Sequence, residues 1–244
     1  MPIAILANRL RSLAADARLG FQVLALRWHR VDRATRARPN LTIQTGAVAS
    51  RVTFEHGRAT GVVYSTARGA FHQPATREVL LCAGSIGSPQ ILQLSGIGPA
   101  DLLQRHGVTP LVHLPGVGAN LQDHLQIRAV FQVQGVKTLN TLANSLWGKA
   151  RIGLEYALKR SGPMSMAPSQ LGAFTRSDPA QPHPNVEYHV QPLSLEAFGE
   201  PLHPFPAFTA SVCNLNPSSR GTVQIKSADF RQAPAIAPNY LSTP

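Results

Sequence analysis

Residues 77–94 read REVLLCAGSIGSPQILQL, and this stretch decides the fold. Its first part, residues 77–84, is a short continuous apolar run that ends at a glycine. That pattern is typical of a strand buried on both faces of an α/β sheet. A helix is then expected to open at Ser88, a favourable N-cap, with Pro89 at the first helical position, where its missing N–H costs nothing. The stretch predicts a strand, a tight turn and a helix.

The segments before this unit predict further strands and helices. Residues 41–73 contain four strand-like segments, at 41–45, 48–54, 59–65 and 71–73, with polar turns between the last three, which predicts an antiparallel meander. Closer to the N-terminus, helices are expected over residues 3–15 and 21–30.

The segments after this unit fall into two groups. A second helix is expected from Pro99, with Gly107 as its C-terminal stop. Beyond residue 126, residues 141–160 have a helical pattern, and residues 161–184 are rich in Gly, Ser and Pro and predict a surface loop. Strands are predicted over residues 127–134, 185–191, 208–214 and 221–226.

The fold class predicted from this order of elements is α/β plus α+β. An α/β domain is expected over residues 1–126. A second domain, with a mostly antiparallel sheet and helices, is expected over residues 127–244.

Composition excludes several classes of protein. The 244 residues carry a net charge of +11, but eight arginines lie within residues 1–38, and no basic stripe interleaved with aromatic residues follows them. Nucleic-acid binding is therefore not expected. No run of eighteen apolar residues and no signal-peptide core is present, so we expect no transmembrane segment and a cytoplasmic location. Two distant cysteines, Cys82 and Cys213, predict reduced thiols, no disulfide and no metal site.

The end of the strand at Ala83 and Gly84 is the strongest local signal for function. Glycine lets backbone approach a ligand closely, and α/β sheets bind ligands at such strand ends. A short glycine turn with no ligand explains the same residues equally well.

Four segments of the chain, taken in order, carry a family resemblance. They are RPNLT at residues 38–42, AGSIGSPQILQLSGIGP at 83–99, LPGVGANLQDH at 114–124, and SRGTV at 219–223 followed by PNYL at 238–241. Together they resemble the glucose–methanol–choline (GMC) flavoprotein oxidoreductases, most closely the choline-dehydrogenase-like branch. The resemblance begins near residue 38, and residues 1–38 do not share it.

The resemblance implies FAD-dependent oxidation of a small-molecule alcohol by hydride transfer from its CH–OH group to the flavin. It implies a partial FAD-binding domain over 1–126 and a substrate-binding domain, incomplete at its C-terminal end, over 127–244. It also implies that a backbone group at Ala49 approaches the adenine, and that Ala83 and Gly84 meet the dinucleotide.

The family's Gly-x-Gly-x-x-Gly motif and its catalytic His are not found in this sequence, so no catalytic residue is assigned. We therefore expect an internal fragment that exposes apolar surface and, alone, neither binds FAD tightly nor turns over. The particular alcohol, the electron acceptor and the oligomeric state stay open. A non-catalytic interaction module with a basic N-terminal segment is the alternative.

Two histidines are candidate functional residues. His124 lies in the third matched block, and a structural role as a buried hydrogen-bonding group is favoured over acid–base chemistry. His189 shares one face of an alternating strand with Glu187 and Gln191. A polar sheet surface is favoured for this face, with the substrate cavity as the alternative.

Overall fold

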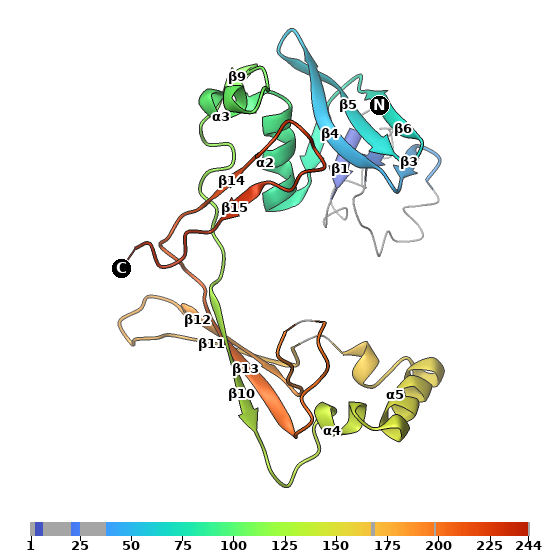
Figure 1. Ribbon diagram of the computed structural model, residues 1–244, viewed down its shortest axis with the longest axis vertical. Coiled ribbons are helices and arrows are strands. Elements are labelled where there is room, and N and C mark those ends of the chain that lie inside the picture. The colour runs from blue at the N-terminus through green and yellow to red at the C-terminus, as the bar shows by residue number, and fades with distance from the viewer. Residues whose placement is uncertain (1–2, 7–20, 25–37, 167–168, 198, 244) are drawn as a thin grey trace. The chain divides into compact units, whose positions relative to one another are not determined.

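The computed structural model describes residues 3–6, 21–24, 38–166, 169–197 and 199–243 (Figure 1). The chain divides into two compact units: the first holds Met1–Gln122 and Ser219–Pro244, and the second holds Asp123–Ser218. The sequence pattern predicts one division near residue 126, and it misses the return of the last segment to the first unit. This return depends on contacts between residues far apart in the chain, which local patterns do not contain.

The first unit contains a parallel four-stranded sheet in the order β3-β2-β1-β7. Because β7 pairs in parallel with β1, the predicted α/β strand before Gly84 is confirmed. The residues of β7 are half-buried rather than fully buried, since β7 lies at the end of this strand order. The four strands are β1 (Ile3–Leu6), β2 (Phe21–Leu24), β3 (Leu41–Gln44) and β7 (Val79–Cys82).

Three predictions for the N-terminal segments need correction. The helices expected over residues 3–15 and 21–30 are wrong where the structure describes them, because β1 and β2 are strands; the remaining residues of both segments lie outside the described residues. Short apolar runs do not distinguish helix from buried strand by their periodicity. β3 belongs to the parallel sheet and not to the meander, because it pairs with β2.

The remainder of the predicted meander is confirmed. It consists of β4 (Val48–Glu55), β5 (Arg58–Thr66) and β6 (Gly69–Pro74), paired antiparallel in that order. His56 and Gly57 join the first two strands, and both have positive φ, 49° and 74°. Two successive residues with positive φ form a type I′ turn, whose twist matches that of the flanking strands.

Helix α2 (Gly84–Leu94) follows β7 and begins five residues earlier than predicted, at Gly84 instead of Pro89. Ser88 lies inside the helix and is not its N-cap. Its Oγ accepts a hydrogen bond from the N–H of Ala83 at 3.0 Å, so the serine still satisfies a backbone donor at the helix start. Pro89 is also inside the helix, where it cannot donate to the Ser85 carbonyl.

Helix α3 (Ala100–Arg105) begins directly after Pro99 and stops before Gly107, as predicted. Gly107 has a φ of 71°, and its N–H donates to the carbonyl of Gln104. The next N–H, of Val108, donates to the carbonyl of Leu103. These two bonds form a Schellman motif, which ends the helix. Two short parallel strands flank α3, namely β8 (Ile97–Gly98) and β9 (Val112–His113).

Two hydrophobic clusters hold the first unit together. Ile91 of α2 packs with buried residues of the meander. Leu94, on the same helix, packs with Leu102 and Leu103 of α3 and with Ile225 from the returning C-terminal segment. This segment also forms the hairpin of β14 (Thr222–Gln224) and β15 (Ala235–Ala237).

The second unit is built on an antiparallel sheet in the order β10-β13-β12-β11. Three of its strands were predicted within a few residues of their bounds: β10 (Gln126–Gln132), β12 (Val186–Gln191) and β13 (Ala207–Asn214). β11 (Leu171–Thr175) lies in the segment expected to be a loop. All five of its residues are exposed, so its sequence lacks the alternation of a half-buried strand.

The helical segment expected over residues 141–160 forms two helices, α4 (Leu139–Ala143) and α5 (Leu146–Lys159). They are separated because Ser145 caps α5, its Oγ accepting a hydrogen bond from the N–H of Gly148 at 3.0 Å. A 3₁₀ turn, η2 (Pro163–Ser165), follows α5. Trp147 on α5 is 88% exposed, which agrees with the expectation of exposed apolar surface.

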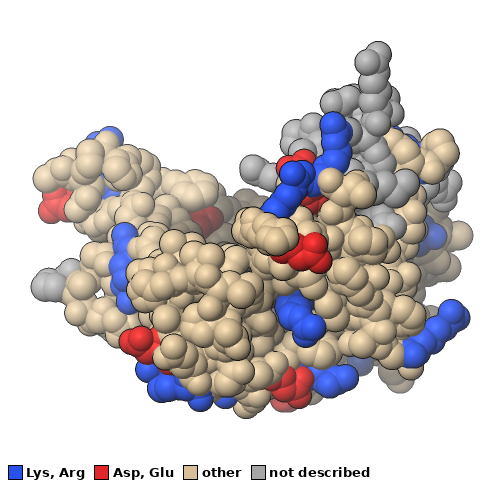
Figure 2. Space-filling view, turned by 90° about the horizontal axis from the view of Figure 1, so that it is seen from above, with Lys and Arg blue, Asp and Glu red and all other residues tan. Residues whose placement is uncertain are grey.

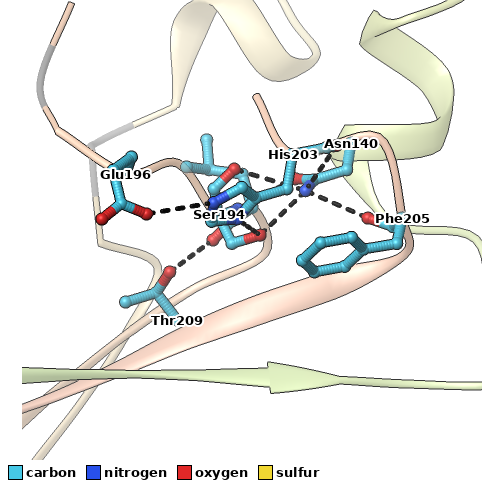
Figure 3. A network of polar contacts seen from close by, with 7 residues as sticks. Asn140, Ser194, Glu196, His203, Phe205 and Thr209 are labelled. Atoms are coloured by element: carbon cyan, nitrogen blue, oxygen red, sulfur yellow. Dashed lines mark hydrogen bonds and ion pairs between the residues drawn. The ribbon is translucent and has the colours of Figure 1, made fainter. Parts of the chain in front are cut away.

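Asn140, on α4, is fully buried and fastens this helix to the segment between β12 and β13 (Figure 3). Its Nδ2 lies within hydrogen-bonding distance of Ser194 Oγ (2.9 Å) and of the carbonyls of Ser194, His203 and Phe205 (3.1–3.3 Å). Its Oδ1 accepts from the N–H of Ser194 at 2.9 Å. One side chain therefore satisfies backbone groups at three points of a long connection.

Replacing Gly153 by alanine is expected to stabilise the second unit. Gly153 lies inside α5, its φ is not positive, and an added Cβ would meet no atom within 4 Å. Alanine exceeds glycine in helix propensity by about 1 kcal/mol. Thermal unfolding followed by circular dichroism should show a higher midpoint for Gly153→Ala and a lower one for Ala157→Gly, the reverse change on the same helix. Equal midpoints for both variants would contradict this account of α5.

Candidate functional site

A groove of about 500 Å³ lies in the first unit, between α2 and the loop that follows β9. From α2 it is lined by Ser85, Ser88, Pro89 and Leu92. The opposite wall is the loop over residues 116–122, which contributes Asn120, with a φ of 59°, and Val223 completes the lining. The groove thus combines apolar walls with a few polar groups, as small-molecule sites do.

The start of α2 gives the groove its electrostatic character. Gly84 has a φ of 81°, which only glycine adopts readily, and a Cβ there would meet no atom within 4 Å. Among the residues that the structure describes, no side chain makes an N-cap bond at Ala83, and the first turn of α2 carries no acidic residue. The N–H groups at a helix start carry partial positive charge and favour anionic or electron-rich ligand groups. Ser85 and Ser88 add hydroxyl groups at this end of the groove.

A buried glutamine holds the groove's second wall in place. The amide nitrogen of Gln93, which is fully buried on α2, donates to the carbonyls of Val117 and Val223 at 3.2 and 3.0 Å. Its Oε1 accepts from the N–H of Ile225 at 2.8 Å. One side chain therefore ties together α2, the loop and the returning C-terminal segment.

Gly118 brings the loop and the C-terminal segment into close contact. Its φ is 83°, and its carbonyl accepts a hydrogen bond from the N–H of Val223 at 2.7 Å. A Cβ at this position would overlap the Val223 carbonyl oxygen and the Gln93 amide nitrogen. The loop can take this path only because residue 118 has no side chain.

The three residues predicted to touch the cofactor occupy different environments. Ala49 is buried on β4 in the same hydrophobic cluster against which Ala83 packs. Gly84 is exposed at the start of α2, next to Ser85 in the groove lining. Gly84 therefore adjoins the groove lining, whereas Ala49 is a core residue and Ala83 is a partly buried residue packed against the same core. Contact of all three with a cofactor stays a prediction.

The groove brings together residues that the sequence did not assign to a site. The sequence pattern predicts only a turn residue at Ser85 and a helix cap at Ser88, although serines beside a glycine at a strand end are a usable signal. Asn120 was named only as part of a matched block, and it lies in the groove wall. His124 is exposed, so the prediction that it is a buried hydrogen-bonding group is wrong.

The remaining predicted residues have defined partners or surroundings. His189 is half-buried, and its Nε2 lies 3.1 Å from Glu187 Oε1, so the predicted shared polar face is confirmed. Both cysteines are free, as predicted, with Cys82 half-buried and Cys213 buried.

Comparison with known proteins finds a family match for the segment that contains most of the groove lining. The sequence model of the GMC oxidoreductases matches residues 29–126, which include α2 and the loop over 116–122. Residues 29–126 belong to the GMC oxidoreductase family. The GMC match begins earlier than the resemblance near residue 38 suggested, so residues 29–38 are family-like. The arginine content of these residues determines their charge but does not indicate whether they match the family.

Individual relatives extend the similarity beyond the GMC segment. The chain is 40% identical over 208 residues to the oxygen-dependent choline dehydrogenase of Pectobacterium atrosepticum, covering 85% of this chain and 37% of that protein. It resembles the formate oxidase of Aspergillus oryzae RIB40, in a structure that addresses FAD modification, with a TM-score of 0.76, 26% identity, and coverage of 85% of this chain and 41% of the oxidase.

A second solved relative is pyridoxine 4-oxidase from Mesorbium loti, with a TM-score of 0.67 and 28% identity over 87% of this chain and 38% of that one. The chain thus spans about two fifths of the length of the relatives that it matches.

Proposed function

We propose that this chain is part of an FAD-dependent GMC oxidoreductase that oxidises an alcohol, and that the groove of the first unit receives part of the FAD. The observation that supports this most strongly is the position of the groove: it opens beside the uncapped start of α2, inside the segment that matches the family. The first unit would then be the cofactor portion of the enzyme, and the second unit the substrate portion.

The residues present fit a dinucleotide cofactor in three respects. The helix start offers backbone N–H groups to phosphate or carbonyl oxygens. The space beside Gly84 is open to a ligand, because a Cβ added there would meet no atom of the described residues within 4 Å. Leu92 and Val117 give the groove apolar walls against which a ring could pack, while Asn120 offers a polar side chain.

Bound FAD would supply the redox chemistry by accepting hydride from the alcohol carbon. The contribution of this chain would be to bind the cofactor and hold it in a fixed orientation. No catalytic residue is assigned among its side chains, and we expect no turnover from this chain alone. Choline is the first alcohol to test, because the 40% identical relative is a choline dehydrogenase.

Other classes of partner find less support. On the face shown in Figure 2, Lys and Arg side chains are scattered among uncharged residues, with Asp and Glu between them. They do not gather there into a stripe that could follow a nucleic-acid backbone. Across the described residues, no helix has the length and apolar character needed to span a bilayer.

Replacing Gly84 by alanine is expected to weaken FAD binding about tenfold or more, because the new Cβ would project into the approach to the helix start and strain a backbone with positive φ. Binding is measured by titrating the labelled chain with FAD and following backbone amide shifts. Shifts are expected at Ser85, Ser88 and Asn120, and they should need far more FAD in the variant.

Gly57→Ala is the matched control, because Gly57 also has positive φ with nothing near its Cβ but lies in the hairpin turn between β4 and β5. Both variants should lose similar stability, and only Gly84→Ala should lose affinity. If saturating FAD moved no groove amide in the unmodified chain, the cofactor proposal would fail and an interaction module would be favoured.

A further inference from the structure

A carboxylate, an imidazole and a thiol meet on one face of the sheet in the second unit. Glu187 and His189 are two residues apart on β12, so their side chains share a face. Cys213 lies directly opposite Glu187 on β13. One ligand atom from each of the three side chains lies within 4.8 Å of the other two. The pairing of two strands therefore assembles three different potential metal ligands.

The chemistry of the three groups matches a borderline divalent cation. Thiolate sulfur, imidazole nitrogen and carboxylate oxygen are the ligands that Zn²⁺ takes in proteins. Zinc–ligand bonds of about 2.0–2.3 Å in a tetrahedron place neighbouring ligand atoms roughly 3.3–3.6 Å apart. His189 Nε2 and Glu187 Oε1 are already 3.1 Å apart. The sulfur of Cys213 lies within 4.8 Å of the other two ligand atoms, so it would have to move toward them to bond the same ion.

The surroundings of Cys213 favour binding of the thiolate. Cys213 is 4% exposed, and Gln126, its partner on the adjacent strand β10, donates from Nε2 to the sulfur at 3.2 Å. A hydrogen bond of this kind supports a metal ligand from the outer shell. The negative charges of the thiolate and the carboxylate would balance those of a divalent ion, which limits the cost of holding it at a partly buried site.

The cluster can also be reached from solvent. The side chains of His189 and Glu187 are 32% and 16% exposed. An ion could therefore enter from the open side of the cluster and keep a water molecule as its fourth ligand. A hydrogen-bonded His–Glu pair with no metal accounts for the contact between these two residues but gives no role to the sulfur beside them.

We propose that Glu187, His189 and Cys213 form a zinc-binding site, with an open fourth position, on the antiparallel sheet of the second unit. This proposal revises the expectation from cysteine spacing that the chain holds no metal. It does not depend on the FAD groove, which lies in the other unit.

The test uses the full chain and Co²⁺, which replaces Zn²⁺ and reports thiolate ligation by a charge-transfer band in the near ultraviolet. One Co²⁺ per chain is expected, displaced by added Zn²⁺. Cys82→Ser is the matched control and should keep the band, because Cys82 lies on β7 in the first unit. Cys213→Ser should lose it, and His189→Gln and Glu187→Gln should weaken binding about tenfold or more.

Thermal unfolding is an independent test of zinc binding, because a ligand that binds only the folded state raises the midpoint of the protein's thermal unfolding. Added Zn²⁺ should raise the midpoint of the unmodified chain and of Cys82→Ser, and should not raise that of Cys213→Ser. The proposal is overturned if no thiolate band forms, or if the band survives in Cys213→Ser. If Cys213→Ser does not fold, unchanged affinity in both His189→Gln and Glu187→Gln overturns it.

Discussion

Gly118→Ala is expected to lower the free energy of unfolding of the first unit by about 3–5 kcal/mol, the sum of an overpacked contact and a strained backbone. The new Cβ would overlap the carbonyl oxygen of Val223, and the residue would have to keep a φ of 83°. Neither neighbour can move away easily, because Val223 belongs to a paired strand and Gln93 is held by three hydrogen bonds.

Urea unfolding followed by circular dichroism measures this loss, and hydrogen exchange of the α2 amides assigns it to the first unit. Gly116→Ala is the control. It lies two residues away in the same loop, its φ is not positive, and its Cβ would meet no atom within 4 Å. It should leave the midpoint nearly unchanged. Equal midpoints for both variants would show that the loop does not pack against the C-terminal segment as described.

Asn140→Ala is expected to destabilise the second unit by about 3–5 kcal/mol, because several buried backbone groups would lose their partner at once. The N–H of Ser194 and the carbonyl of Phe205 would lose their side-chain partner, and the His203 carbonyl would keep only the bond from Asn144 (Figure 3). Faster hydrogen exchange of the Ser194 amide should accompany the lower urea midpoint.

Asn144→Ala provides a matched comparison for this prediction. Asn144 also donates to the His203 carbonyl, at 3.0 Å, but it is exposed and makes this one side-chain bond. Its loss should cost less than about 1 kcal/mol, since water can replace the donor. If the two asparagine variants were equally stable, burial of Asn140 would not be the cause of its effect.

Local patterns in the sequence predicted the strand–turn–helix unit, the second helix and most strands of both sheets. These elements have strong local signals: a glycine after an apolar run, a glycine at a helix end, or alternation along a strand. The start of α2 was misplaced because a serine can satisfy the backbone from inside a helix as well as from its N-cap. β11 was missed because none of its residues is buried.

Contacts between distant residues could not be predicted in this way. Gln93 bonds residues 24, 130 and 132 positions away, and nothing in the sequence around it indicates these partners. Alternation placed Glu187 and His189 on one face, but only the register of β12 against β13 brings Cys213 to them. The same holds for the groove, whose walls are joined by the returning segment.

The backbone pairing of Leu121 with Gly221 has a topological consequence. Their two mutual hydrogen bonds, of 2.9 and 2.8 Å, lie just before the chain leaves the first unit and just after it comes back. In the second unit, Gln126 and Cys213 lie opposite each other on the antiparallel strands β10 and β13. The second unit is thus an insertion into the first, and the two ends of the first unit that flank it are paired with each other. In such a topology the inserted unit can be removed or replaced without breaking the pairing of the strands in the first unit.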